Sequence, residues 1–188
     1  MDNYYVQQAL TGDTDAFRCI IKAHRDMAFT IAISILKDEY RAEEVVHDAF
    51  VNAFKALPKF RQSSKFSTWF YRIVVNEALQ RLKKRKNEKI DFVDDFDAEP
   101  VAEDLILSLE AKERKILINE ALNRLPADES LALRLFYLEE SSIKEVEAIT
   151  GWSSSKVKVS LHRGRKHMLI LLNKLISKTS NNGPDGKK

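Results

Sequence analysis

Hydrophobic residues recur at the spacing of an α-helix in five stretches of the chain. These stretches are residues 17–35, 46–57, 66–82, 117–125 and 131–138. The second and fourth are followed by Pro58 and Pro126, which lack the backbone N–H needed to continue a helix. The 188 residues include only 5 Gly and 4 Pro, too few for the many turns of an all-β fold. The sequence therefore predicts an all-α protein.

A compact pair of helices is predicted after residue 141. Ser142 and Glu145 have the spacing of a capping box, which starts a short helix. Gly151 can adopt the left-handed conformation that ends it. Ser153 or Ser154 can cap the next helix, which we expect to run to about residue 172. Two helices joined by a tight, glycine-containing turn are typical of a helix-turn-helix unit.

Charge divides the chain into three parts. The net charge is +3 overall, but it is +5 over residues 1–89, −7 over residues 90–104 and +5 over residues 105–188. The acidic stretch is interrupted by Pro100 and cannot bury enough apolar surface to fold alone. We therefore expect two small helical domains joined by a flexible acidic linker. The expected bounds are 1–89 for the first domain, 90–110 for the linker, 111–176 for the helix-turn-helix domain and 177–188 for a disordered tail.

Basic domains favour an anionic partner, either nucleic acid or a membrane surface. The longest apolar run, residues 27–36, is about half the length of a membrane span, and the N-terminus lacks the pattern of a signal peptide. Cys19 is the sole cysteine, which fits a reducing compartment. We expect a soluble, cytoplasmic protein.

The second helix of the helix-turn-helix unit separates apolar from basic side chains. At about 100° per residue, Val157, Leu161, Gly164 and Met168 fall on a side suited to packing. The opposite side and its flanks carry Ser155, Lys156, Lys158, Val159, His162, Arg163, Arg165 and Lys166. From residue 148 onward the only acidic residue is Asp185, so this face differs from a solvated helix laced with ion pairs. It predicts docking in a DNA major groove, with cations for phosphates and reach to base edges.

The sequence carries no strong signal of catalysis. His24 lies on an apolar stripe, which indicates a core histidine, and Cys19 is expected to be a small buried group. His162 and His167 are five residues apart, a spacing that does not bring two metal ligands to one helix face. There is no Gly-rich phosphate loop, zincin motif or paired cysteine site. We expect no enzyme activity, no catalytic residue, no metal or other cofactor and no small-molecule substrate.

Two motifs in the first domain resemble a known family. They are Ala-Glu-Glu-Val-Val-His-Asp-Ala-Phe at residues 42–50 and Thr-Trp-Phe-Tyr-Arg-Ile-Val-Val-Asn at residues 68–76. With the helix-turn-helix region at 125–172, they resemble bacterial RNA polymerase sigma factors, specifically the small extracytoplasmic-function (ECF) group. The resemblance spans about residues 5–175. It implies a factor that binds core RNA polymerase and directs promoter-specific initiation, including strand opening at the minus-10 element.

The resemblance assigns roles to three sets of residues. The minus-35 set is the eight-residue basic face described above. The polymerase-binding set is Glu44, His47, Asp48 and Val51. The minus-10 set, which would meet promoter DNA as duplex and as non-template single strand, is Phe60, Arg61, Ser63, Ser64, Lys65, Phe66, Trp69, Arg72 and Asn76. The family usually has Asp and Gln where this chain has Glu44 and His47, and often a small polar residue where it has Val159, so the relatives' promoter sequence does not carry over.

Two other functions fit the residues alone. A stand-alone helix-turn-helix regulator, with a helical dimerisation or sensor domain at the N-terminus, would bind its operator without polymerase. A helical adaptor would present its basic faces to acidic proteins. The resemblance further implies an anti-sigma factor, often membrane-anchored, that would hold the protein at the inner membrane. It also implies that the acidic linker, through Asp94, Asp95 and Asp97, lies near the RNA exit path of the polymerase.

Overall fold

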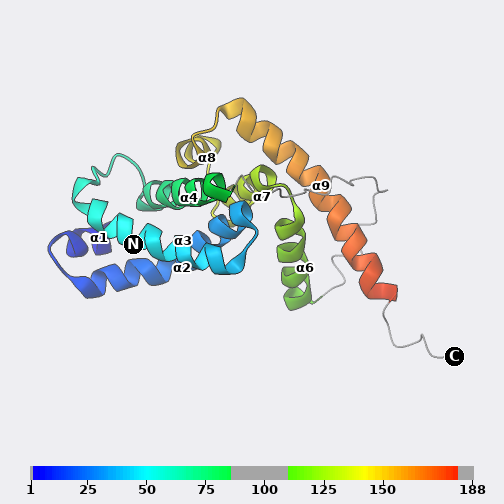
Figure 1. Cartoon of the computed structure of the whole chain (residues 1–188), viewed down its shortest axis with the longest axis horizontal. Coiled ribbons are helices and arrows are strands. Elements are labelled where there is room, and N and C mark those ends of the chain that lie inside the picture. The colour runs from blue at the N-terminus through cyan, green and yellow to red at the C-terminus, as the bar shows by residue number, and fades with distance from the viewer. Residues whose placement is uncertain (1, 86–109, 182–188) are drawn as a thin grey trace.

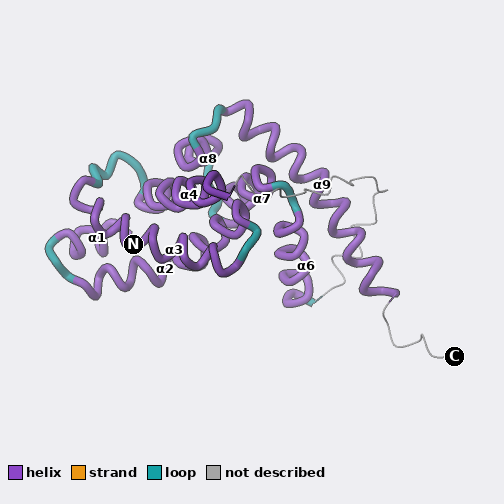
Figure 2. Tube along the Cα trace, viewed as in Figure 1, coloured by secondary structure: helices purple, strands orange, loops and turns teal. Residues whose placement is uncertain are grey.

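The structure, a computed structural model, describes residues 2–85 and 110–181, and this part of the chain is helices and loops (Figures 1 and 2). The expected linker lies outside the described residues, apart from Glu110. The elements are α1 (Asp2–Leu10), α2 (Thr14–Leu36), α3 (Glu39–Ala56), the 3-10 turn η1 (Leu57–Lys59), α4 (Phe66–Arg85), α6 (Ala111–Arg124), α7 (Ala127–Leu133), the π-helical turn η2 (Arg134–Leu138), α8 (Ile143–Thr150) and α9 (Ser154–Asn181).

Helices α1 to α4 form an N-terminal bundle. Asp13 starts α2 by accepting hydrogen bonds from the backbone N–H groups of Asp15 and Ala16 at 2.9 and 3.1 Å. Helix α1 was not predicted from the sequence, because its nine residues show only a weak apolar stripe, yet it buries Val6 and Ala9 against the bundle.

Aromatic rings fill the centre of this bundle. Phe50 and Phe70 stack with their ring centroids 4.5 Å apart, and Phe66 stacks on Phe70 at 5.9 Å. His24 is buried among these rings, and its Nδ1 lies 2.9 Å from the hydroxyl of Tyr71. The prediction of a core histidine is therefore confirmed. Cys19 is exposed on α2, so the prediction that it is buried is wrong: the buried stripe of α2 passes through Phe17 and Ile20 on either side of it.

Helices α6 to α9 form a C-terminal bundle that contains the predicted helix-turn-helix. Ser142 and Glu145 make the capping box at the start of α8, and Gly151 ends that helix with a φ of 73°. The hydroxyl of Ser153 then accepts the backbone N–H of Lys156 at 3.3 Å, which starts α9. Helix α9 continues to Asn181, beyond the expected end near residue 172. This corrects the expectation of a disordered tail for residues 177–181.

The two bundles pack against one another and share a continuous apolar core that runs from Val6 to Leu161. Helix α2 contacts α7, and α4 contacts α8, as the adjacent ribbons in Figure 1 show. Where α2 meets α7, the hydroxyl of Ser130 lies 3.4 Å from that of Ser34, and both side chains are fully buried. We call this packing of one bundle on the other the closed arrangement.

Candidate nucleic-acid and polymerase interfaces

The predicted minus-35 face is exposed along α9. All eight of its residues are solvent-exposed, whereas Val157, Leu161 and Gly164 are buried on the opposite side. Gly164 allows α9 to approach α7 closely, because a Cβ at this position would lie 3.1 Å from the Leu133 side chain. The predicted orientation of this helix is therefore confirmed: its small and apolar side packs on α7 and α8, and its basic side faces solvent.

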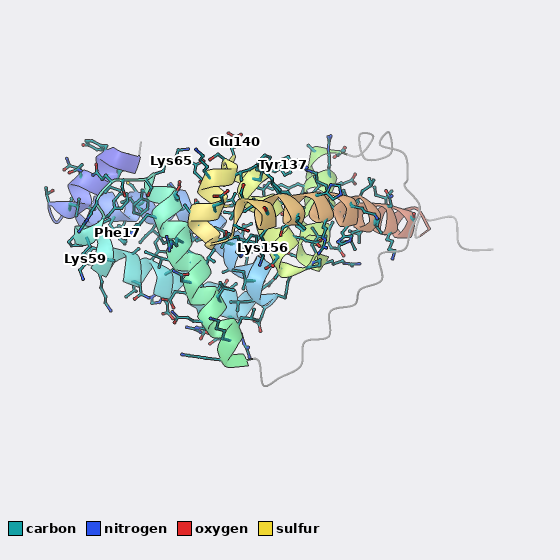
Figure 3. All side chains as sticks on the ribbon, turned by 90° about the horizontal axis from the view of Figure 1, so that it is seen from above. Phe17, Lys59, Lys65, Tyr137, Glu140 and Lys156 are labelled. Carbon is teal, nitrogen blue, oxygen red and sulfur yellow. The ribbon has the colours of Figure 1, made fainter. Side chains whose placement is uncertain are left out.

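The two flanking cations of this face are held in place by neighbours. The Lys156 ammonium lies 2.8 Å from the Asp128 carboxylate and 4.4 Å from the centre of the Trp152 ring. Arg165 donates from Nε to the Tyr137 hydroxyl at 2.8 Å and lies over the Tyr137 ring (Figure 3 labels Lys156 and Tyr137). Tyr137 was not identified from the sequence, because nothing along the chain joins η2 to residue 165.

The centre of this face, next to Lys156 and Arg165, carries side chains that are available to bind a partner. Lys158, His162, Arg163 and Lys166 make no hydrogen bond or ion pair with other residues that the structure describes, and Val159 is 48% exposed. A cleft of about 450 Å³ between α7 and α9 adjoins this centre and is lined in part by Val159 and Arg163. Free cations beside an exposed methyl-bearing side chain are suited to phosphates and thymine methyl groups.

The predicted minus-10 loop, residues 60–65, projects polar groups and buries its aromatic anchors. Arg61, Ser63, Ser64 and Lys65 are all exposed. Phe60 is 8% exposed and packs on Trp69 with ring centroids 4.9 Å apart. Phe66, at 1% exposure, is a core residue that faces the same way as Phe70, four positions on. In this arrangement neither phenylalanine is accessible to a base, and both instead anchor the loop.

The start of α4 nevertheless offers a surface for nucleic acid. Trp69 is half-buried, and Arg72 and Asn76 are exposed. The three lie at i, i+3 and i+7, on one side of the helix. The partly exposed indole is therefore a candidate for stacking on a base, with a guanidinium and an amide on the same side of the helix.

The minus-10 loop is tied to the helix-turn-helix unit. The Lys65 ammonium lies 2.8 Å from Oε1 of Glu145, in the α8 capping box (Figure 3 labels Lys65). Tyr71 on α4 donates from its hydroxyl to Glu139 at 3.4 Å. Hydrogen bonds from Lys65 and Ser142 lower the pKa of Glu145 to about 2, and the same carboxylate raises the pKa of Lys65. The closed arrangement thus places two predicted DNA-binding elements in contact with each other.

The predicted polymerase-binding residues lie together on α3. Glu44 and Asp48 are half-buried, and both accept hydrogen bonds from the Arg81 guanidinium of α4, at 2.6 and 2.5 Å. His47 and Val51 are exposed, so they present the accessible part of this surface. Arg81 was not identified from the sequence, since its two partners lie more than thirty residues away in the chain. It orients both carboxylates and neutralises part of their charge.

A groove next to His47 runs along the junction of the bundles. It has a volume of about 840 Å³ and an apolar floor that includes Phe29, Val46 and Phe50. Its rim carries charged residues of both signs, among them Glu43 of α3 and Arg134 of η2. Within the described residues no group of three or more His, Cys, Asp or Glu side chains could hold a metal ion. Among the same residues, none of the helices is both long and apolar enough to span a membrane.

The two bundles match two parts of one family. Residues 20–88 match Sigma-70 region 2, and residues 115–168 match Sigma-70, region 4. The ECF RNA polymerase sigma factor SigW of Bacillus subtilis is 29% identical over 173 residues, which cover 86% of this chain and 91% of SigW. The ECF RNA polymerase sigma-E factor of Escherichia coli is 29% identical over 178 residues, covering 88% of this chain and 91% of that protein.

Two solved structures share the fold. The sigma factor RpoE from Bartonella quintana, in complex with the anti-sigma factor NepR, matches with a TM-score of 0.63 and 24% identity, over 84% of this chain and 96% of that one. CnrH, in complex with the cytosolic domain of CnrY, matches with a TM-score of 0.62 and 23% identity, over 92% and 97%.

The two family matches identify this pair of helical bundles as a two-domain transcription initiation factor. The chain belongs to the sigma-70 family of RNA polymerase sigma factors, in its ECF group. It binds core RNA polymerase and promoter DNA and directs promoter-specific initiation. The comparisons favour this function over the stand-alone regulator that the residues alone left open.

Proposed function

We propose that the exposed face of α9 reads the minus-35 element as duplex. Lys158, Val159, His162 and Arg163 reach base edges or adjacent phosphates, and Lys166 adds a further phosphate contact. The flanking cations Lys156 and Arg165 would fix the orientation of the helix on the backbone, since their neighbours already restrict them. The observation that carries this proposal is the exposed cluster of Lys158, His162, Arg163 and Lys166 on one face of α9, where none of the four pairs with another residue that the structure describes.

The second element of the proposal is the start of α4. Trp69 would stack on a non-template base once the duplex opens, with Arg72 and Asn76 holding the backbone or base edge. Stacking of a base on an aromatic side chain stabilises binding by about 1–3 kcal/mol, comparable to the cost of unstacking it. Capture of the flipped base therefore offsets the cost of unstacking it and contributes to melting at the minus-10 element. Arg61, Ser63, Ser64 and Lys65 would line the path of the strand.

The third element is the surface of α3. His47 and Val51 would contact core polymerase directly, and Glu44 and Asp48 would do so through the oxygen lone pairs that Arg81 leaves free. We further propose that the chain has no catalytic activity of its own and acts in the cytoplasm.

Transcription with purified core polymerase and a cognate promoter tests the proposal. Arg163→Ala should reduce promoter-specific transcripts about tenfold, as expected for the loss of roughly 1–3 kcal/mol of base discrimination. Its affinity for core polymerase should be unchanged. Lys22→Ala, which removes an exposed cation from α2, is the matched control and should transcribe normally. Loss of core binding by Arg163→Ala would contradict the division of labour between the bundles.

We also propose an anti-sigma factor as a partner that stabilises the closed arrangement. Two observations support it: the structurally similar RpoE and CnrH were solved with NepR and CnrY, and the groove at the junction has an apolar floor that a protein segment could cover. A membrane-anchored partner of this kind would hold the chain at the inner membrane. Co-purification of the tagged full chain, followed by competition with core polymerase, tests whether such a partner excludes the polymerase.

A further inference from the structure

The junction between the two bundles brings two positive side chains together. Lys37 ends α2 and belongs to the N-terminal bundle, whereas Arg134 begins η2 in the C-terminal bundle. Arg134 is 3% exposed, and the ammonium nitrogen of Lys37 is buried with no hydrogen-bond acceptor among the described residues. Burial of like charges near each other raises the free energy of the arrangement that creates it.

The two cations differ in how their own bundles support them. Arg134 donates from Nη2 to Oδ1 of Asn123 at 2.7 Å and from Nε to the Ser130 hydroxyl at 3.4 Å, and both partners lie in its own bundle. These contacts do not depend on the N-terminal bundle. Lys37 has no such support, and burial together with the charge of Arg134 lowers its pKa to about 8. The unfavourable energy therefore falls on Lys37, first through burial of its ammonium and second through the charge of Arg134 on the other bundle.

The nearest carboxylate in the chain does not compensate Lys37. Asp38 accepts the backbone N–H of Arg41 at 3.1 Å to start α3, and it also pairs with the Arg41 side chain at 3.4 Å. On the far side of the junction, η2 contributes the Arg134 cation. On the near side, Glu39 and Glu43 of α3 lie along the same groove as Arg134. No ion pair joins any of these described carboxylates to Lys37.

The backbone role of Lys37 does not require a charge. Its φ of 54° makes it the left-handed C-cap of α2, and its N–H donates to the Ile33 carbonyl at 3.0 Å. Glycine or asparagine is the usual residue at such a position. A lysine here adds a buried ammonium to a cap that an uncharged residue would complete.

We propose that Lys37, buried beside Arg134, weakens the closed arrangement so that polymerase and promoter DNA can separate the two bundles. This rests on the proposed function, in which α9 and α4 must reach separate promoter elements. The attractive contacts lie where α4 meets α8, through Lys65 with Glu145 and Tyr71 with Glu139. The repulsive pair lies where α2 meets η2. These polar contacts and the shared apolar core favour the closed arrangement, and the repulsion at Lys37 opposes them.

Changes of charge at position 37 test this proposal in the full chain. Lys37→Met removes the charge and keeps a long apolar stem, and Lys37→Glu places a carboxylate beside Arg134. The ratio of closed to open molecules should rise about tenfold for Lys37→Met, because removing the buried charge removes a cost equivalent to about one pKa unit. The ratio should rise further for Lys37→Glu. Lys22→Met, on an exposed part of the same helix, should leave the ratio unchanged.

The ratio can be measured by single-molecule energy transfer between dyes on the two bundles. Cys19 is exposed on α2, and Ser177→Cys supplies a second exposed attachment point near the end of α9. Thermal melts of each variant check that the fold is intact. An unchanged or smaller closed fraction in Lys37→Met would overturn the proposal.

A second measurement separates this proposal from the function on which it rests. The energy-transfer experiment contains no polymerase, so it reports on Lys37 alone. Titration of core polymerase into the same labelled variants should show weaker binding in the order wild type, Lys37→Met, Lys37→Glu. If the closed fraction rises as expected while polymerase affinity stays constant, Lys37 acts on the junction as proposed, but polymerase binding does not require separation of the bundles.

Discussion

The ammonium of Lys65 and the carboxylate of Glu145 lie 2.8 Å apart, although they are 80 residues apart in the chain. Lys65 belongs to the predicted minus-10 loop and Glu145 to the capping box of α8. One ion pair therefore couples the element expected to hold melted DNA to the unit expected to read duplex DNA. Under the proposed function, binding of both elements to the promoter is expected to break this pair.

Removing the charge of Glu145 should make opening easier. Glu145→Gln keeps side-chain oxygen and nitrogen atoms for the cap of α8 but loses the ion pair with Lys65. The open fraction should rise about twofold to fivefold, since an exposed ion pair contributes about 0.2–1 kcal/mol. Energy transfer between the bundles measures it, and Glu140→Gln, at an exposed nearby site, is the control. Equal effects of the two variants would mean that the ion pair with Lys65 does not hold the bundles together.

The stability of the protein should depend on pH through Lys37. Its pKa falls from 10.5 to about 8 on folding, so between these values the folded chain binds fewer protons than the unfolded chain. Stability from this residue therefore rises with pH across that window. Arg134, with a pKa lowered by burial to about 10, acts in the same direction above the window.

Comparison with Lys37→Met isolates this contribution, because other groups titrate alike in both proteins. Urea unfolding at pH 7.5 should show the variant about 1–2 kcal/mol more stable than wild type. At pH 9.5 the difference should be smaller. A difference that is constant with pH would show that Lys37 is not the titrating group.

Replacement of Trp69 should affect strand opening more than initial promoter binding. Trp69→Ala removes the half-buried indole at the start of α4. Loss of one stacked base corresponds to about a tenfold to hundredfold decrease in the open complex. Permanganate reactivity of unpaired thymines measures opening, and a gel shift with duplex promoter measures the closed complex. Equal damage to both steps would assign Trp69 a purely structural role.

Phe66 provides the contrast for that experiment. Because Phe66 is 1% exposed, Phe66→Ala should lower the free energy of unfolding by about 3–5 kcal/mol. It should act on both promoter steps through loss of folded protein. The two rings are neighbours on α4, with centroids 5.5 Å apart, so the pair compares a half-buried aromatic residue with a fully buried one at the same place in the fold.

Tyr137 should support recognition of the minus-35 element through Arg165. Tyr137→Phe removes the hydroxyl that accepts from Arg165 at 2.8 Å but keeps the ring beneath the guanidinium. Affinity for duplex promoter in the holoenzyme should fall about twofold to fivefold, consistent with the net value of one exposed hydrogen bond. Tyr40→Phe, at an exposed tyrosine on α3, is the matched control. No change in Tyr137→Phe would show that Arg165 needs no fixed orientation.

Local patterns predicted most of the secondary structure. Pro58, Gly151 and the pair Ser142 and Glu145 act within a few residues of themselves, so their effects on helix ends could be inferred directly. Helix α1 was missed because its stripe is short, and the length of α9 was underestimated because the apolar residues after residue 172 were left out of its stripe. The two-bundle organisation followed from the charge distribution.

The contacts between distant segments could not be predicted in this way. The partners of Arg81, Arg165 and Lys65 are brought near by packing, and no spacing rule connects them. Phe66 and Trp69 both suit a DNA-binding surface by chemistry, and only the direction of each side chain from α4 tells which one is accessible. The buried ammonium of Lys37 is likewise invisible in sequence, since it depends on which bundle covers it.

Ser34 on α2 and Ser130 on α7 meet where the two bundles pack, with their hydroxyls 3.4 Å apart and both side chains fully buried. The effect of a substitution at either position should therefore depend on the size of the new side chain. Alanine should be accommodated at either position, whereas leucine or phenylalanine should prevent the two bundles from packing and favour the open arrangement. Such variants would free the chain from any regulator that works by keeping its two bundles together.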